Sequence, residues 1–461
     1  MTTEYSDTTR KVLVVAYVFP PVGGGGVQRT HKFVKYLPSF GWQPVVLTPK
    51  HAAFDYQDQT LGDEVDHEVQ VYKTFSVEPP RLYSSFIKKH FGEYSANVPQ
   101  PNRPSFRSLL IAATLKPIFN LLRWSAHNLV FVPDAHVGWI PFAVWRGLRV
   151  IRSERIDIIY ATGDPYSDFL IGLFLSRLTG KPLVLDMRDP WTLGPDIKFS
   201  RARTAIENFW ERRCVNAAAT VINITEAATQ AYREKFANAD PSKFVCITQG
   251  FDPTDFDDVV GGKTEKFTIA ATGTYYEFRT PESFLKALRS LVDEKPWLEN
   301  LLQVRFMGVG EKIVQHFVAE YDLAAVVEVL PYGTHRESIQ LLMDSDVLLL
   351  DFFASLDNME HLGSTSSRVF EYIGSGRPIL GLVYPSGAAA DVINSTRSGI
   401  VVDPRDTPQV AAAIHSLFER YQSGEGVDDL PFNERPNLER FTRKHLTGSL
   451  AHIMDDALAT T

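Results

Sequence analysis

Residues 364–380 combine small polar side chains with a carboxylate at a spacing suited to chemistry. Ser364, Thr365 and Ser366 precede an amphipathic helical pattern, and Glu371 follows Ser364 by about two helical turns. Serine and threonine are good N-caps, and the free N–H groups and dipole of a helix start favour an anion such as a diphosphate. Glu371 can accept hydrogen bonds from hydroxyls beside that phosphate. The stretch predicts a nucleotide or nucleotide-sugar site; a well-capped helix with a solvated glutamate is the alternative.

A second phosphate-binding candidate lies near the start of the chain. Gly23, Gly24, Gly25 and Gly26 follow an apolar strand pattern at 11–19 and a pair of prolines. A strand, a glycine loop and a helix in this order bring backbone amides close to a phosphate. The dinucleotide fingerprint is matched poorly, because spaced glycines after the first are missing. A flexible glycine turn is the alternative.

The helical pattern after the glycines has an apolar and a polar side. We expect the apolar side to face the core and the polar side to face water. The apolar residues are Val27, Phe33, Val34 and Leu37, and the residues expected in solvent are Gln28, Arg29, Lys32 and Lys35.

Composition narrows the class of protein. A chain of 461 residues exceeds the usual size of one core, so two domains are expected. The net charge of -8 argues against a nucleic-acid partner. Cys214 and Cys246 are the only cysteines, which fits a reducing compartment. The first ten residues lack a signal-peptide pattern and no apolar run has the length of a membrane span, so a cytoplasmic location is expected.

One amphiphilic stretch, residues 107–124, is apolar with a few basic residues and ends in Trp124. Such a segment can lie on a membrane surface, with a kink at Pro117. Burial against the domain is at least as good an interpretation. Peripheral membrane contact at this stretch is therefore an open expectation.

The fold class expected is α/β, with two doubly wound Rossmann-like domains facing across a cleft. Apolar strands alternate with amphipathic helices in two successive runs, which indicates crossover units and parallel sheets. The expected divisions are an N-terminal domain at 1–250, a linker at 251–266, a donor-binding domain at 267–430 and a C-terminal helical segment at 431–461 packing across the domains. In the linker, Asp255 and Asp257 are expected to be solvated.

Several short blocks then resemble one enzyme family along nearly the whole chain. In this order they resemble retaining glycosyltransferases of family 4, which have the two-Rossmann B-type fold. The blocks are residues 19–29 (FPPVGGGGVQR), Pro133-Asp134 with Gly138-Trp139, 188–191 (RDPW), 247–252 (ITQGFD), Gly273 with Arg279, 330–333 (LPYG) and 367–378 (SRVFEYIGSGRP).

The resemblance implies a nucleotide-diphospho-sugar donor, UDP- or GDP-linked, bound mainly by the second domain. Glu371 matches the glutamate that binds the donor ribose, and Arg279 matches a basic residue that meets the diphosphate. The glycines at 23–26 would close over the donor phosphate. The remaining donor-side candidates are Gly273, Pro331, Tyr332, Gly333, Gly363, Ser364, Thr365, Ser366 and Arg368, of which Pro331, Tyr332 and Gly333 would flank the base.

Two positions depart from the family pattern. The family has a glutamate eight positions before the second one, whereas this chain has Gly363, so backbone amides at 363–365 would contact the transferred sugar. The family often has a histidine after the fourth strand, whereas this chain has Arg188 and Asp189. These two residues could touch the sugar or acceptor, or form a salt bridge within the loop. With Arg279 and Glu371 they are the catalytic candidates.

The acceptor side is assigned to loops after the N-terminal strands, because ligands of such sheets bind beyond the strands' carboxyl ends. The candidates are Asp134, His136, Thr162 and Ser167. The function expected is retaining transfer of a sugar to a hydroxyl of a sugar or lipid-linked glycan in surface polysaccharide or glycoconjugate synthesis, with no cofactor and no metal. The alternatives are a nucleotide-sugar epimerase, a nicotinamide-dependent oxidoreductase and a non-catalytic nucleotide-sugar-binding protein.

Overall fold

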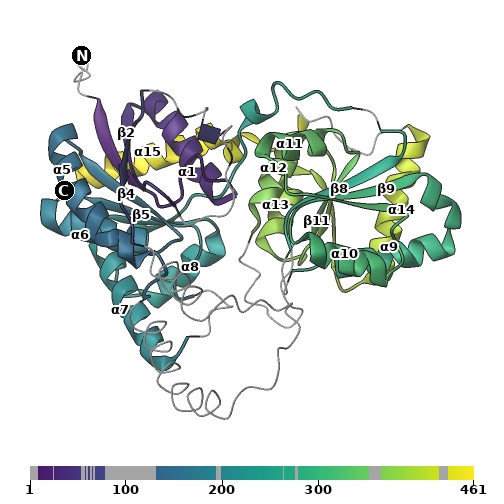
Figure 1. The fold of residues 1–461 in the computed structure, drawn as a ribbon, viewed down its shortest axis with the longest axis horizontal. Helices are drawn as coiled ribbons and strands as arrows, with labels where there is room; N and C mark the ends of the chain where they lie inside the picture. The colour runs from purple at the N-terminus through teal and green to yellow at the C-terminus, as the bar shows by residue number, and fades with distance from the viewer. Residues whose placement is uncertain are drawn as a thin grey trace, which may run out of the picture.

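The structure is a computed structural model. It describes residues 9–23, 25–52, 58, 61–62, 65, 68–77, 131–193, 199–262, 264–275, 279–351, 365–424 and 434–460. Gly24, Gly363, Ser364 and the stretch 107–124 lie outside these residues. Figure 1 shows two α/β domains side by side, each with helices on both faces of a parallel sheet.

The N-terminal domain contains a seven-stranded parallel sheet in the order β3-β2-β1-β4-β5-β6-β7. This order reverses between β1 and β4, as expected for a doubly wound sheet. Its strands are β1 (Arg10–Val15), β2 (Trp42–Pro49), β3 (Gln70–Thr74), β4 (Ile158–Gly163), β5 (Leu183–Met187), β6 (Thr220–Asn223) and β7 (Phe244–Cys246), and its α-helices are α1 (Gly25–Tyr36), α5 (Ile140–Glu154), α6 (Ser167–Thr179), α7 (Arg201–Ala217) and α8 (Glu226–Lys235).

The C-terminal domain repeats this plan with six strands in the order β10-β9-β8-β11-β12-β13. The expected α/β class with two Rossmann-like domains is therefore confirmed. Its strands are β8 (Phe267–Thr274), β9 (Leu302–Val309), β10 (Val327–Leu330), β11 (Val347–Asp351), β12 (Ile379–Leu382) and β13 (Gly399–Val402), and its α-helices are α9 (Glu282–Glu294), α10 (Glu311–Glu320), α11 (His335–Met343), α12 (Ser367–Ser375), α13 (Ala388–Thr396) and α14 (Thr407–Ser423).

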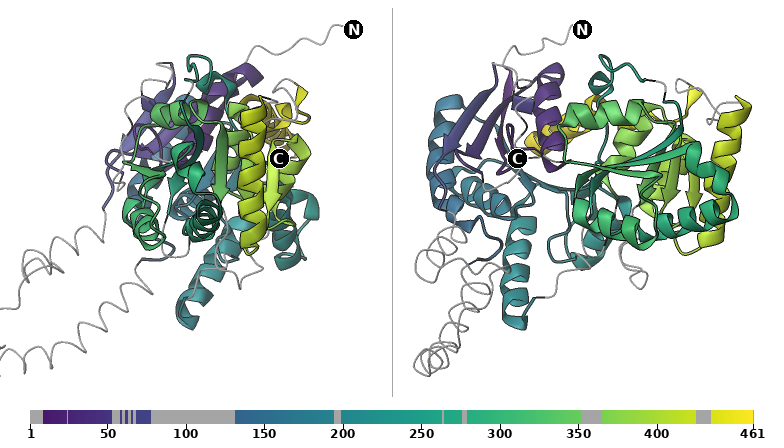
Figure 2. Two further views of the ribbon diagram at one scale, coloured as in Figure 1. Left: turned by 90° about the vertical axis from the view of Figure 1, so that its right-hand side faces the viewer. Right: turned by 45° about the vertical axis from the view of Figure 1, so that its right-hand side comes forward.

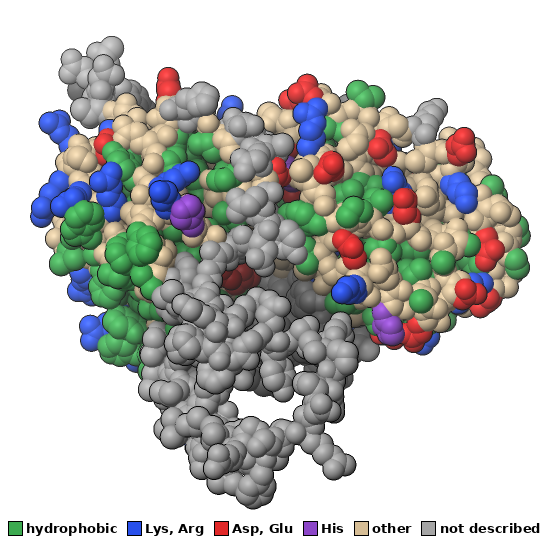
Figure 3. Space-filling model, viewed as in Figure 1, with side chains coloured by type: hydrophobic (Ala, Val, Ile, Leu, Met, Phe, Trp, Pro, Cys, Tyr) green, Lys and Arg blue, Asp and Glu red, His purple; other side chains and the backbone are tan. Residues whose placement is uncertain are grey.

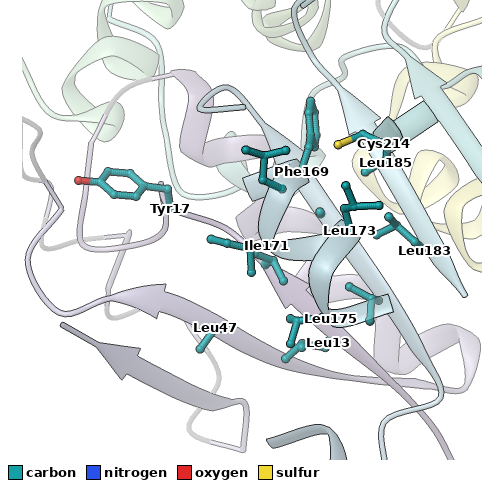
Figure 4. Packing of buried hydrophobic residues seen from close by; sticks show 14 of the residues in the cluster. Leu13, Tyr17, Leu47, Phe169, Ile171, Leu173, Leu175, Leu183, Leu185 and Cys214 are labelled. Atoms are coloured by element: carbon teal, nitrogen blue, oxygen red, sulfur yellow. The ribbon is translucent and has the colours of Figure 1, made fainter. Parts of the chain in front are cut away.

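Both cores follow from the alternation of side chains along buried strands. In β1, Leu13 and Val15 pack toward α5 and α6, whereas Val12 and Val14 pack toward α1 on the other face. Figure 4 shows Leu13 beside Leu175 of α6, with Ile171 and Phe169 further along that helix. Each sheet therefore has two dry faces, and polar chemistry is left to the loops at its carboxyl edge.

The last helix, α15 (Arg443–Ala459), packs on the first domain rather than on the second. Leu450 and Met454 are buried with Val12 and Phe33 in one cluster. The helix lies along α1, behind the N-terminal sheet in Figure 1 and beside the domain junction in Figure 2. Among the described residues, the chain passes from the first domain to the second after β7 and returns to the first domain at α15.

The expectation that the polar side of α1 faces water is wrong for three of its four residues. Gln28, Arg29 and Lys32 are almost fully buried. The Arg29 guanidinium donates to both carboxylate oxygens of Asp186, at 2.7 and 3.0 Å, and to the carbonyls of Ile247 and Thr248. Burial lowers the pKa of Arg29, but the charge and hydrogen bond of Asp186, with smaller contributions from Tyr160 and Cys246, together raise it above its ordinary value. The polar side of α1 is an internal interface.

Lys32 connects α1 to the segment between the two domains. Its ammonium lies 3.0 Å from Asp252 and is also paired with Asp255, both in the segment that joins the two sheets. Lys35 and Tyr36 also bond Asp252, at 2.9 and 2.7 Å. The expected solvated loop is therefore wrong for Asp255, although Asp257 is exposed. The segment is fastened to α1 by charge.

Candidate functional site

A cleft of about 370 Å³ lies between the two domains, at the carboxyl edges of both sheets. This is the crevice in which doubly wound sheets bind ligands. The N-terminal domain contributes Gly26, Gln28, Asp58, Leu61, Arg188, Asp189, Ile224 and Gln249, and the C-terminal domain contributes Thr272, Gly273, Thr274, Arg279, Met307, Gly308, Tyr332, Gly333, Thr334, His335, Ser338, Thr365, Ser366, Ser367, Arg368 and Glu371.

Three helices present their first residues to this cleft. Gly26 lies in the first turn of α1, His335 begins α11 and Ser367 begins α12. Thr334 caps α11 in a capping box with Glu337, and Ser366 caps α12. Because helix starts carry unpaired N–H groups and partial positive charge, their convergence favours an anionic ligand.

Glu371 lies in the cleft beside His335. Oε1 of Glu371 is 3.5 Å from Nε2 of His335, and both side chains are largely buried. Burial alone lowers the pKa of His335, but the hydrogen bond and charge of Glu371, with the charge of Asp255, raise it above its ordinary value. The pair supplies a hydrogen-bond acceptor within reach of the converging helix starts.

Arg368 fixes the geometry of α12 rather than reaching for a ligand. It is 5% exposed, and its guanidinium donates to the carbonyl of Thr272 at 2.7 Å and to the Asp351 carboxylate at 3.2 Å. Gly273 has φ of +123°, and a Cβ there would lie 2.6 Å from Cδ of Arg368. Glycine is therefore required at 273, where strand β8 and helix α12 meet closely.

Arg188 contacts the glycine loop across the N-terminal domain. Its guanidinium donates to the carbonyl oxygens of Gly163 (3.1 Å), Gly26 and Asp164. A Cβ on Gly26 would lie 2.7 Å from Nη1 of Arg188. The guanidinium is thus held by backbone, and Asp189 beside it is exposed at the cleft.

The residues expected on the acceptor side form a group of their own. Asp134 accepts from the backbone N–H groups of His136 and Ser167, both at 2.8 Å, and from the Ser167 hydroxyl at 2.7 Å. Burial raises the pKa of Asp134 despite these bonds. Asp134, His136, Thr162 and Ser167 do not line the cleft. Asp134 instead joins the turn at His136 to the start of α6 at Ser167.

Most of the other predicted site residues line the cleft, and two of them do not. Gly273, Arg279, Tyr332, Gly333, Thr365, Ser366, Arg368 and Glu371 line the cleft, whereas Pro331 and Gly23 do not. Gly23 is nevertheless adjacent, because a Cβ there would lie 3.3 Å from Oη of Tyr332 in the other domain. Gly25 begins α1.

Many residues that line the cleft were not predicted as site residues, and His335, Gln249 and Asp58 are the ones with polar side chains that matter most for the argument. His335 follows the Thr334–Glu337 capping pattern, which marks a helix start and was a usable signal. Gln249 lies in the block 247–252, and nothing in its residue type marks it as a site residue. Asp58 accepts from the backbone N–H of His335 at 3.1 Å, across the domains. No feature of the sequence around Asp58 indicates that contact.

None of the helices in the described part of the chain is both long and apolar enough to cross a membrane. No curated protein sequence matches the chain significantly. Residues 24–248 match the family described as "Glycosyl transferase 4-like domain".

Solved structures share the fold over nearly the whole chain. Sucrose-phosphate synthase from Thermosynechococcus elongatus superposes with a TM-score of 0.62 at 13% identity, covering 98% of this chain and 100% of that one. TarM gives 0.58 at 11% identity, covering 98% and 99%. A putative UDP-N-acetylglucosamine 2-epimerase from Listeria monocytogenes gives 0.54 at 11% identity, covering 98% of each. Residues 24–248 therefore form a glycosyl transferase 4-like domain, within a chain that has the two-domain B-type glycosyltransferase fold.

Proposed function

We propose that this protein is a retaining, metal-independent glycosyltransferase that moves a sugar from a nucleotide-diphospho-sugar to a hydroxyl of a sugar or lipid-linked glycan. The observation that carries the proposal is the position of Glu371. It lies on α12, whose first residues share the cleft with the start of α11. One cleft thus offers a phosphate seat and a hydroxyl acceptor, the two features that a nucleotide sugar needs.

The proposed donor lies along the C-terminal wall. Its diphosphate contacts the helix starts at Thr365 and Ser366 and the guanidinium of Arg279, which can hold phosphate with parallel hydrogen bonds. Its ribose hydroxyls donate to Glu371, while Tyr332 and Gly333 flank the base. UDP and GDP both satisfy this arrangement.

The chemistry follows from the charges of the cleft. Transfer breaks the bond between the anomeric carbon and a diphosphate oxygen, which builds positive charge on the sugar and negative charge on the phosphate. Donors already aimed at the departing phosphate lower this barrier, because they need no rearrangement when the charge develops. Arg279 and the helix starts supply that positive charge in place of a metal ion. The acceptor hydroxyl attacks the anomeric carbon and gives its proton to the departing phosphate oxygen.

Arg188, Asp189 and Gly26 face the donor from the N-terminal wall. In this proposal they contact the transferred sugar and the acceptor, the place that the family often gives to a histidine. Retention of configuration and a role in surface polysaccharide or glycoconjugate synthesis rest on the family resemblance. Action in the cytoplasm, at the inner face of the membrane, belongs to the same proposal.

A thermal-shift screen against UDP- and GDP-sugars tests the donor site. A ligand that binds only the folded state adds about 2.7 kcal/mol of stability at a concentration a hundredfold above its Kd. We expect one nucleotide sugar to raise the Tm of the wild type and not that of Glu371→Ala. Glu311→Ala, an exposed glutamate on α10, is the matched control and should keep the shift. The absence of a shift with every donor would overturn the proposal.

Product analysis separates transfer from the other activities considered. Turnover only with an added acceptor, giving a product with the donor's anomeric configuration by NMR, supports retaining transfer. An epimerised nucleotide sugar formed without any acceptor would support the epimerase instead. Donor binding with no turnover on any glycan acceptor would identify a binding protein.

A further inference from the structure

Three neighbouring helices of the N-terminal domain expose large apolar side chains. Trp145 on α5 is 56% exposed, Leu178 on α6 is 63% exposed and Phe209 on α7 is 47% exposed. The helices pack side by side on one face of the sheet, and a ring contact between Phe174 and Trp210, at 6.0 Å, joins α6 to α7. We call the outer surface of α5, α6 and α7 the arginine-aromatic face.

The charge on this face has a single sign. All residues of α5, α6 and α7 are described, and their four carboxylates are buried or half-buried, with Glu207 and Glu211 paired to cations. Six of their arginines are exposed: Arg149, Arg152, Arg177, Arg201, Arg212 and Arg213. The surface of these three helices is therefore positively charged, although the whole chain has a net charge of -8.

The arginines are placed against the aromatic rings. Cζ of Arg149 lies 3.6 Å from the ring centre of Trp145, and Cζ of Arg213 lies 4.8 Å from that of Phe209. Figure 3 shows basic and apolar side chains gathered on the side of the N-terminal domain where Figure 1 places α5 and α6. Each of these two rings thus carries a guanidinium over its face.

We propose that the arginine-aromatic face docks this protein on an anionic lipid bilayer. Tryptophan and phenylalanine partition into the headgroup region, and each nearby arginine is attracted to anionic lipid. A bilayer suits separated rings, because each one inserts without a matching pocket. The rest of this acidic protein is repelled by the same surface, so the face also sets the orientation of the docked molecule.

The face is connected to the loops of the cleft. Helix α7 holds the loop that carries Arg188 and Asp189, because Glu207 accepts from the Trp191 indole at 2.7 Å and Glu211 accepts from the Thr192 hydroxyl at 2.7 Å. A docked bilayer would lie against the helix that supports the N-terminal wall of the cleft. The proposal is independent of the donor chemistry proposed above.

Vesicle co-sedimentation of the full chain tests the proposal. The vesicles are phosphatidylcholine alone or phosphatidylcholine mixed with phosphatidylglycerol. We expect wild-type binding to the mixed vesicles, weak binding to the neutral ones, and loss of binding at high salt. Arg149→Gln with Arg152→Gln should lower partitioning about twenty-fivefold, if each arginine contributes about fivefold. Trp145→Ser should lower partitioning severalfold at every salt concentration.

Matched changes on the other domain are the controls. Lys286→Gln with Lys312→Gln removes the same charge from exposed sites on α9 and α10, and Trp297→Ser removes an exposed tryptophan. These variants should bind as the wild type does. Equal losses in test and control variants, unchanged binding of the face variants, or no binding of the wild type would each overturn the proposal. Concentration-dependent self-association that the face variants abolish would assign the face to a second copy of the chain instead. The donor-induced Tm shift reports the cleft separately, so failure here leaves the proposed function intact.

Discussion

Nε2 of His335, the first residue of α11, lies 3.5 Å from Oε1 of Glu371 on the neighbouring helix α12. The contact joins the capped start of one helix to the middle of the next. Glu371 is thereby oriented toward the cleft by a histidine whose pKa is raised above its ordinary value by the hydrogen bond and charge of Glu371. The position of Glu371, the proposed acceptor of the ribose hydrogen bonds, therefore depends on the protonation of His335.

Because the folded-state pKa of His335 is raised above its unfolded value, protonated His335 stabilises the fold. This stabilisation is complete below about pH 6, near the unfolded pKa of histidine. It is lost as the pH rises through the raised folded-state pKa. We expect urea unfolding to show a larger difference in free energy between wild type and His335→Gln at mildly acidic than at alkaline pH. His316→Gln, at an exposed histidine on α10, is the control, and a pH-independent difference would contradict the assignment.

Arg279→Ala should weaken binding of a nucleoside diphosphate about tenfold to a hundredfold, since a hydrogen bond to a charged group contributes about 1.5–3 kcal/mol. Isothermal titration calorimetry with the diphosphate and the parent nucleoside measures both affinities. The nucleoside should bind both proteins equally, because it has no phosphate to lose. An equal loss for both ligands would place Arg279 elsewhere than on the diphosphate. Arg279→Lys keeps the charge and should lose less.

Arg29→Met should lower the free energy of unfolding by about 3–5 kcal/mol, because it leaves the Asp186 carboxylate buried without its cation. Tyr160 also donates to Asp186 and would remain as its partner. The double variant Arg29→Met, Asp186→Leu should recover part of the loss. Chemical denaturation of the three proteins checks this. A single variant within about 1 kcal/mol of wild type would show that water or a backbone shift replaces the arginine.

Met454→Ala should lower the free energy of unfolding by about 2–5 kcal/mol, because the side chain is fully buried among residues of the first domain. Lys444→Ala, at an exposed position on the same helix, should stay within about 0.5 kcal/mol. Thermal and urea unfolding measure both. Equal losses of unfolding free energy in the two variants would show that α15 does not stabilise the N-terminal core.

The order of strands and helices could be read from the sequence, because buried parallel strands are continuous apolar runs. The apolar strand pattern at 11–19 contains most of β1, Arg10–Val15, and the helical pattern after the glycines became α1, Gly25–Tyr36. The helix start at Ser366 was also predictable from the sequence, because capping depends on residues that are adjacent in the chain.

The errors lie where a side chain's partner is distant in the sequence. Arg29 and Lys32 have the spacing of a solvated helix face, and their partners Asp186 and Asp252 come from other elements. The role of Asp134 likewise depends on Ser167, and the contact of Asp58 depends on α11 in the other domain. Single-sequence patterns report on neighbours along the chain, so such contacts are not visible in them.

The position of α15 has a consequence for how this protein is made. Val12, Val14 and Phe33 at the front of the chain are covered by Leu450 and Met454 near residue 460. On the ribosome, the first domain emerges early but keeps an apolar groove open until the second domain has been synthesised. Its completion waits for the last helix, and during that interval the groove is a natural binding surface for a chaperone.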